Sequence, residues 1–296
     1  MSLFVQACIL GLLTGGVYAL MASGLTLAFG IMKVINVSQG AMIILGAYLS
    51  YTAFNTYHID PFLSVVIVGP LVFLLGTVVQ YVFLRPLHRH DRESLSLLVT
   101  WALALGIEGV LSVIYSTTYR STITSYADKS WRFLGGQIPV VRVYAFAMSF
   151  VVLGALYIML WRTRFGRAVR GTVQNPTSAA LLGVDSRWVS AVGFGVSIST
   201  AAIAGAVFGI VFPFNPGSHY DLISRLLTII VLGGMGSLGG AVVAALLMGV
   251  IESVLAAGVV PFIAPIWAPM GFFVVLIVIL VLRPQGLFGV RERGQL

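Results

Sequence analysis

Two acidic residues stand inside apolar stretches of this sequence and are the first candidates for chemistry. Glu108 lies in TWALALGIEGVLSV, and Glu252 lies in LMGVIESVLAAG. An ionisable side chain within a membrane span is costly and therefore indicates function, here an ion or proton relay. The alternative is a carboxyl that hydrogen-bonds between helices, which we favour because relays gather several polar groups around such acids. Glu252 has a further alternative, a place near the outer end of its helix, facing Arg225.

The other reactive groups indicate no catalytic machinery. The sequence has no GxxxxGK[ST] motif, and no lysine follows the glycine-rich run GGMGSLGG, so we expect no nucleotide site. Ser237 in that run is the only plausible nucleophile of an intramembrane enzyme, but no histidine lies in a nearby span to activate it. Cys8 is the only cysteine. We expect no bound metal, because the histidines all fall in predicted loops, away from any serine or acid of a span: His58, His88, His90 and His219.

Composition decides what kind of fold positions these residues. Hydrophobic residues make up 59% of the 296 residues and charged residues only 9%, with a mean hydropathy of +1.03. A soluble domain carries about a quarter charged residues. The chain is therefore expected to be an all-α, polytopic transmembrane bundle that forms a single domain over residues 1–296. The net charge of +8 lies in short loops, where membrane orientation explains it, so no nucleic-acid partner is expected.

Apolar runs of about 20 residues predict the membrane spans. The nine candidate spans lie near residues 4–30, 37–57, 61–84, 94–117, 142–161, 188–212, 222–236, 239–258 and 266–282. Because the first of these is long and the seventh is short, eight full spans with re-entrant pieces fit nearly as well as nine.

Glycine interrupts two of these apolar stretches, at residues 24–48 and 227–249. Broken helices at membrane depth are tolerated only inside protein or along a wet cavity, so both stretches are candidates for lining a translocation pathway. The alternative for each stretch is a tight turn at the membrane surface. Together with Glu252, the candidate pathway residues are Asn36, Ser38, Gln39, Gly40, Gly233, Gly234 and Ser237.

One polar insert, residues 162–187, stands out from the apolar sequence with five arginines and one acid, Asp185. Asn175 can cap the free amides of a short helix, and Pro176 suits its first position because no N–H is needed there. A short helix flanked by arginines and held between two spans suits docking onto a soluble partner. The insert therefore indicates a transporter subunit that is driven by another protein.

Lysine and arginine placement predicts the orientation. Most of the 17 basic residues share one side if the loop after Leu84 is cytoplasmic. The N-terminus is then outside, and the insert and the C-terminus are cytoplasmic. The outer loop 118–141 is either a contact surface for an extracytoplasmic partner or a simple connection.

Several motifs together resemble one family. The segment GRAVRGTVQNPTSAALLGVDSRWVSAVGFGVSISTAAIAGAVFG is similar to the coupling segment and following span of the LivH-type permeases, membrane subunits of branched-chain amino acid ABC importers. The late glycine motif VLGGMGS, followed by Gly240 and Ala241, resembles the same family, as does the closing RPQGLFG. The N-terminal signature is similar at Tyr18, Ala19, Leu20, residues 24–30, Asn36 and Gly40. Two features depart from the family pattern, Ser38–Gln39 and Glu108, and they leave the substrate open among branched-chain and other amino acids, urea, short amides and aromatic acids.

The resemblance implies partners and a docking site. Such permeases lie in membrane lipid and work with a homologous second permease, two ATPase subunits and a periplasmic or lipid-anchored binding protein. ATP and Mg²⁺ are then bound by the ATPases, and this chain binds no cofactor. The helix near Asn175–Gly183 would dock in a cleft of the ATPase. The expected coupling residues are Arg167, Arg170, Asn175, Pro176, Ala179, Ala180, Leu182 and Gly183.

The sequence therefore predicts a permease subunit of an ABC importer in the inner (cytoplasmic) membrane, with no enzymatic activity of its own. It would move branched-chain amino acids or a related small polar or amphipathic solute by alternating access. Two alternatives stay open at this point. One is an ion-coupled secondary transporter that uses Glu108 or Glu252, and the other is an intramembrane enzyme that uses Ser237.

Overall fold

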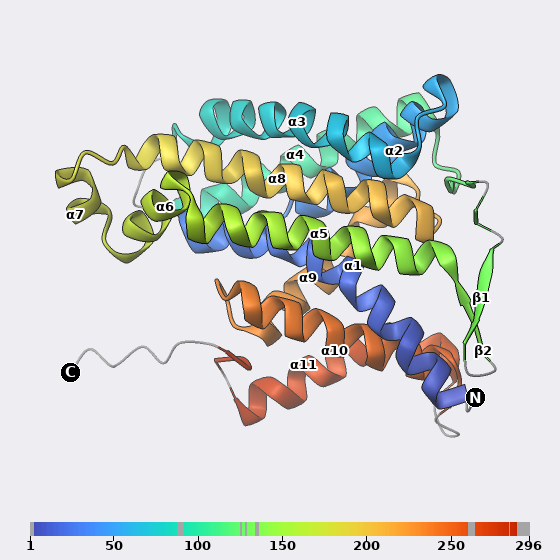
Figure 1. Cartoon of the computed structure of the whole chain (residues 1–296). Helices are drawn as coiled ribbons and strands as arrows, with labels where there is room; N and C mark the ends of the chain where they lie inside the picture. Colours follow the sequence, from blue (N-terminus) through green and yellow to red (C-terminus); the bar gives the residue numbers. More distant parts are fainter. Residues whose placement is uncertain are drawn as a thin grey trace.

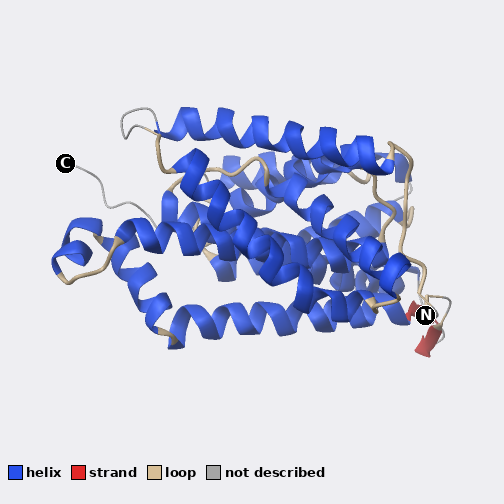
Figure 2. Cartoon of the chain, turned by 90° about the horizontal axis from the view of Figure 1, so that it is seen from above, coloured by secondary structure: helices blue, strands red, loops and turns tan. Residues whose placement is uncertain are grey.

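The computed structural model is a bundle of long helices that lie along a common direction, with a small β-hairpin at one end (Figure 1). The structure describes residues 3–87, 92–124, 126–127, 129–133, 136–259, 264–283 and 285–288. We call the end of the bundle that carries α6 and α7 the insert end. The opposite end, which carries the β-hairpin and the N-terminus, is the hairpin end (Figures 1 and 2).

Eleven α-helices lie within the described residues. In chain order the α-helices are α1 (Leu3–Met32), α2 (Gln39–Tyr57), α3 (Pro61–Val79), α4 (Arg92–Tyr115), α5 (Val140–Arg162), α6 (Arg164–Gln174), α7 (Pro176–Leu181), α8 (Ser186–Val211), α9 (His219–Gly233), α10 (Leu238–Ala256) and α11 (Met270–Leu282). A π-helical turn, η1 (Gln80–Leu84), extends α3, and two 3-10 turns are η2 (Pro216–Ser218) and η3 (Pro265–Trp267). The strands β1 (Ser130–Phe133) and β2 (Gly136–Pro139) pair antiparallel.

Polar caps start several of these helices where the apolar runs begin. Asp60 accepts a hydrogen bond from the N–H of Phe62 at 2.9 Å at the start of α3, and Asp185 accepts one from the N–H of Arg187 at 2.8 Å at the start of α8. Each cap satisfies an amide that has no partner within the helix. The capping residues therefore fix where these helices enter the bundle.

The core is built around α1 and α8, which pack on each other, while α10 packs on α1 and both α2 and α3 pack on α8. In its most apolar stretch α8 is 78% buried, whereas α4 is 17% and α5 is 22% buried, so α8 is central and α4 and α5 are peripheral. Small residues allow the central helices to approach closely. A Cβ added at Gly205 of α8 would clash with the carbonyl oxygen of Ile43, and one added at Gly46 of α2 would clash with Ala202.

The fold class agrees with the all-α expectation, apart from the two-stranded hairpin. Each of the nine predicted apolar segments contains a helix, but only six helices are long and apolar enough to span a membrane by themselves: α1, α3 with η1, α4, α5, α8 and α10. The helices α2, α9 and α11 were expected as spans and fall outside that set. The expected count of eight or nine spans is therefore not established by length and composition.

The two expected helix breaks occupy different environments. The first, residues 33–38, lies inside the bundle, where Asn36 and Ser38 are fully buried. A Cβ added at Gly24 would come within 2.5 Å of the Gln39 amide, so α2 starts roughly 10 Å short of the end of α1. The second break, residues 234–237, is a tight turn at the insert end, where Met235 and Gly236 are exposed.

Candidate functional site

The insert folds as two helices that project from the bundle at the insert end (Figures 1 and 2). Thr163 caps α6 by accepting a hydrogen bond from the N–H of Gly166 at 3.1 Å. Asn175 caps α7, as predicted, by accepting one from the N–H of Ser178 at 3.0 Å, and Pro176 takes the first position of that helix. The local sequence therefore accounts for the start of both helices.

The tip of α7 presents apolar side chains to solvent. Leu181 is 86% and Leu182 is 85% exposed, although both belong to the most buried kind of residue in globular proteins. Gly183 follows with φ of +82°, a conformation that L-residues disfavour, and it ends the helix. Exposed leucines at the end of a projecting helix are typical of a surface that another protein covers. Leu181 lies within the expected docking helix, residues 175–183, but was not singled out among its coupling residues.

The remaining predicted coupling residues divide into outward and inward groups. Arg167 and Ala180 are exposed, whereas Ala179 is buried, facing Gly171 of α6. Arg170 turns inward, where it donates a hydrogen bond to the Leu160 carbonyl and lies 5.0 Å from the centre of the Trp161 ring. Arg170 therefore fixes α6 against the end of α5, Ala179 packs on α6, and only part of the predicted set faces outward.

A large cavity opens beside the insert. It has a volume of about 1260 Å³ and lies between the end of α1, η1, α6, α7 and the start of α8. Among the described residues of its lining, Lys33, Arg85 and Arg187 contribute positive charge, and Asp185 contributes a carboxylate.

The predicted pathway residues of the first break form a buried polar cluster. Asn36 Oδ1 accepts hydrogen bonds from the N–H and the hydroxyl of Ser38 at 3.1 and 2.6 Å. Asn36 Nδ2 donates to Gln39 Oε1 at 3.3 Å, and Gln39 Nε2 donates to the Ser197 carbonyl at 3.3 Å. Gly40 packs against the carbonyl of His219. The bond to the Ser38 N–H supplies a partner that the broken backbone lacks, and the side-chain bonds pair the remaining polar groups of the cluster.

The predicted residues of the second break pack closely and turn the chain. Gly233 lies directly against Gly240, and Gly234 has φ of +95°. Ser237 caps α10 by accepting a hydrogen bond from the N–H of Gly240 at 3.1 Å. Capping of α10 thus gives Ser237 a structural role.

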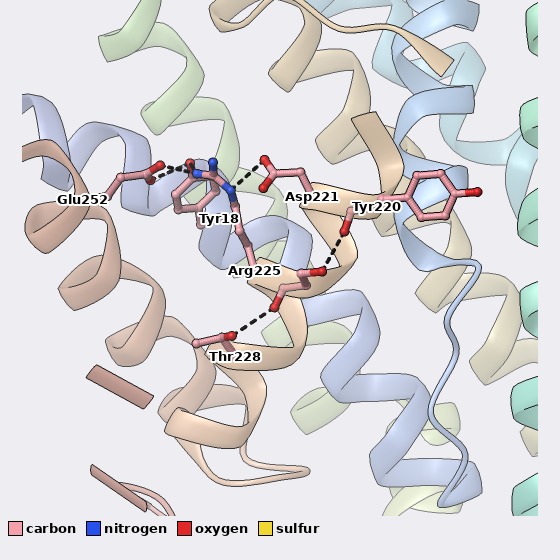
Figure 3. A network of polar contacts seen from close by, with 7 residues as sticks. Tyr18, Tyr220, Asp221, Arg225, Thr228 and Glu252 are labelled. Atoms are coloured by element: carbon pink, nitrogen blue, oxygen red, sulfur yellow. Dashed lines mark hydrogen bonds and ion pairs between the residues drawn. The ribbon is translucent and has the colours of Figure 1, made fainter. Parts of the chain in front are cut away.

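Glu252 joins a charged cluster between α1, α9 and α10 (Figure 3). Arg225 forms an ion pair with Glu252 and another with Asp221, with 2.9 Å between Nε and Oδ2. The Tyr18 hydroxyl donates to Glu252 Oε2 at 2.8 Å and accepts from Arg225 Nη1 at 2.8 Å. The structure thus agrees with the alternative that placed Glu252 opposite Arg225. Glu252 also lines a cavity of about 390 Å³ towards the hairpin end, with Tyr18 and Arg142.

Glu108 on α4 contacts the start of α9. His219 Nε2 lies 3.0 Å from Glu108 Oε2, and the Tyr220 hydroxyl donates to the same oxygen at 2.9 Å. The expectation that no histidine lies beside an acid of a span was wrong, because the break before α9 carries His219 into the bundle, where it is buried. His58 caps the end of α2, and His88 and His90 lie outside the described residues. No group of three metal-binding side chains occurs among the described residues.

Comparison with known proteins decides which family this arrangement belongs to. Residues 8–282 match the model of the branched-chain amino acid transport system, permease component. The chain belongs to this family. Its members are multi-pass transport subunits of ABC systems that carry no ATPase domain, and this chain is a permease component of a branched-chain amino acid ABC transport system.

Individual relatives agree with the family match. A probable branched-chain amino acid transport permease protein LivH from Methanocaldococcus jannaschii is 29% identical over 80% of this chain and 76% of its own length. The high-affinity permease protein LivH of Escherichia coli is 27% identical over 97% of this chain and 96% of its own. The permease protein LivM of E. coli is 24% identical over 86% of this chain and 67% of its own. No solved structure matches the chain.

Proposed function

We propose that this permease translocates branched-chain amino acids, or a related small polar or amphipathic solute, as one half of a pair with a homologous second permease. The likeness to both LivH and LivM of one organism supports such a pair. Two ATPase subunits, which bind ATP and Mg²⁺, drive the cycle, and an extracytoplasmic binding protein delivers the solute. The permease itself holds no cofactor in this scheme.

The proposal that this permease docks onto an ATPase subunit rests on the exposed tip of α7. Leu181 and Leu182 project almost entirely into solvent from a helix that is anchored to the bundle through α6. Burying these two side chains in a partner cleft stabilises the contact by about 1.5–3 kcal/mol each. The other exposed members of the predicted set on α6 and α7 are Arg167, Asn175, Ala180 and Gly183. Movement of the docked ATPases would then be transmitted through α6 and α7 to α5 and α8.

The proposed orientation follows from the positive charges at the insert end. The cavity lined by Lys33, Arg85 and Arg187 lies there, so this end is cytoplasmic by the positive-inside rule. The N-terminus is then outside, the C-terminus is cytoplasmic, and the protein lies in the inner membrane. Counting α2, α9 and α11 as further spans beside the other six helices gives nine crossings, which is consistent with this orientation.

The pathway residues belong to the same proposal. Glu252 lines the cavity at the hairpin end, and the cluster around Asn36, Ser38, Gln39 and Gly40 lies at the buried break of α1 and α2. The turn that joins α9 to α10 is shaped by Gly233, Gly234 and Ser237. These two breaks would serve as the joints at which the bundle changes between outward- and inward-facing states.

Co-purification tests the proposal directly. The complex is purified in mild detergent with the wild-type chain and with the double variant Leu181→Ser and Leu182→Ser. We expect the variant to lose the ATPase subunits and ATP-dependent leucine uptake while it keeps the second permease. Ile266→Ser, at an 81% exposed residue far from α7, is the matched control and should retain the ATPases. Full retention of the ATPases by the leucine variant would overturn the docking role.

A further inference from the structure

The large cavity beside the insert has a positively charged lining that the proposed function uses for orientation alone. Its cations are Lys33, Arg85 and Arg187, and Asp185 is the carboxylate among the described residues of the lining. None of the three cations forms an ion pair with a described residue. Asp185 caps α8, where it accepts a hydrogen bond from the backbone N–H of Arg187. The described lining therefore carries a net positive charge, which attracts anions.

All three cations lie at the ends of helices that are long and apolar enough to span a membrane. Lys33 directly follows α1, Arg85 directly follows η1 at the end of α3, and Arg187 lies in the first turn of α8. Such helices cross the hydrocarbon core, which is about 30 Å thick, so the residues at their ends reach the level of the lipid phosphates. The cavity therefore lies in the headgroup region of one leaflet.

One wall of the cavity continues into an apolar surface. Tyr81 of η1 lines the cavity, and the Arg85 guanidinium lies 4.6 Å from the centre of the Tyr81 ring. Leu74 and Val78 of α3 precede Tyr81 at helical spacing, and they are 65% and 59% exposed. A ligand whose charged group lies beside Arg85 can therefore place an apolar tail along α3.

The wall also holds two polar atoms without a hydrogen-bond partner among the described residues. They are Gln80 Oε1 and Thr172 Oγ1, which belong to lining residues that are only 3% and 8% exposed. Buried polar atoms of native proteins nearly always have a partner. A small side-chain rotation towards the cavity gives each atom a partner on a bound ligand. The Thr172 hydroxyl can donate to a phosphate oxygen, and Gln80 Oε1 can accept from a headgroup hydroxyl.

The chemistry of the cavity selects a phosphate group that carries an apolar tail. Guanidinium groups match the geometry of phosphate oxygens, and a lysine ammonium adds a compact positive charge. Basic pockets between spans bind the headgroups of anionic lipids in this way. The cavity volume of about 1260 Å³ accommodates a whole headgroup. A free phosphate ion would use the cations but would leave the apolar surface of α3 without a partner.

We propose that this cavity binds the headgroup of an anionic phospholipid through Lys33, Arg85 and Arg187, with the acyl chains along α3. The cavity is also lined by Thr172 of α6 and Thr177 of α7, so the bound headgroup lies between the insert and the bundle. Lipid in this position braces α6 and α7 against the ends of α1 and α3. The site concerns neither the solute nor its pathway, and the inference goes beyond the proposed function.

Lipid binding to the purified complete complex tests this site. The complex is stripped of lipid in detergent and titrated with dioleoylphosphatidylglycerol or with zwitterionic dioleoylphosphatidylcholine, and native mass spectrometry counts the bound lipids. Arg85→Gln removes one cation of the cavity, and Lys33→Gln gives a second variant if Arg85→Gln does not assemble. Arg283→Gln is the matched control, because Arg283 directly follows α11 but does not line the cavity.

We expect the complex to bind phosphatidylglycerol about tenfold more tightly than phosphatidylcholine. Arg85→Gln and Lys33→Gln should each weaken the binding of phosphatidylglycerol about fivefold, because each removes one basic residue at the membrane surface. Arg283→Gln should leave this affinity nearly unchanged. Equal affinity for the two lipids, or an equal loss in Arg283→Gln and Arg85→Gln, would overturn the site.

Two further arms of the experiment distinguish other occupants. Displacement of phosphatidylglycerol by inorganic phosphate, but not by chloride at equal ionic strength, would assign the cavity to a free anion and contradict the lipid. Binding that appears only after the ATPase subunits are removed would show that an ATPase covers the cavity, which also contradicts the proposal. Lipid counting does not require transport, so loss of ATP-driven uptake, which tests the proposed function, is a separate result.

Discussion

Arg225 on α9 and Glu252 on α10 form an ion pair within the bundle, and the side chains of both are only 16% exposed. Tyr18 joins them from α1, so three helices that are distant in sequence meet at one charged cluster. Asp221 extends the pair towards the exposed side of α9. A buried pair of this kind holds the helices in one arrangement, because either charge alone would be left without a partner.

Removing one member of this pair should therefore cost more than removing both. Arg225→Met leaves Glu252 with the Tyr18 hydroxyl as its remaining hydrogen-bond partner among the described residues, and we expect the variant to lose about 3–5 kcal/mol of stability. Adding Glu252→Gln should restore most of the loss, because the neutral amide can still accept the Tyr18 hydrogen bond. Heat-induced unfolding of the purified complex in detergent, followed by size-exclusion chromatography, measures the difference. Additive losses in the double variant would show that the two residues do not interact.

The conformation of Gly183 gives a test of coupling. A side chain at φ of +82° costs roughly 1–2 kcal/mol and would change the angle at which α7 ends, although a Cβ there meets no other atom. Gly183→Leu should leave the protein in the membrane and uncouple ATP hydrolysis from leucine uptake. Gly239→Leu is the control, because its Cβ also meets no atom and its φ is not positive. Normal uptake by the Gly183→Leu complex would count against a docking role for this segment.

Close packing of α2 against α8 gives a prediction about stability. Gly205→Val introduces a side chain where the Ile43 carbonyl leaves no room, and we expect a loss of at least about 1–3 kcal/mol. Gly154→Ala on α5, where a Cβ meets nothing, should instead be neutral or gain about 0.5–1 kcal/mol. The yield of monodisperse protein and its unfolding temperature report both effects. Equal behaviour of the two variants would contradict the close approach of these helices.

The energy source distinguishes this permease from an ion-coupled transporter. Leucine uptake into proteoliposomes that contain the whole complex should require ATP on the side of the ATPases. A protonophore should leave its rate unchanged, including in the Glu252→Gln variant. Glu108 and Glu252 would then act through their contacts with His219, Tyr220, Tyr18 and Arg225 rather than as ion carriers. Uptake that continues without ATP and stops when the proton gradient collapses would contradict this prediction.

Local sequence determined much of the architecture. Apolar runs predicted where helices form, because a helix satisfies its own backbone hydrogen bonds in lipid. Asn175 and Pro176 predicted the start of α7, since a cap and an N1 proline act within one turn of the chain. The same residues, together with the glycine motifs, carried the resemblance to a family to which the chain does belong.

Only the tertiary structure decided which polar groups meet. No local pattern places His219 beside Glu108, which is 111 positions away, or Tyr18 beside Glu252, which is 234 positions away. Nor does the sequence distinguish the buried break before α2 from the exposed turn before α10, because both contain glycine and small polar residues. Partners and burial depend on how helices distant in sequence pack, and that packing reflects shape complementarity summed over the whole bundle.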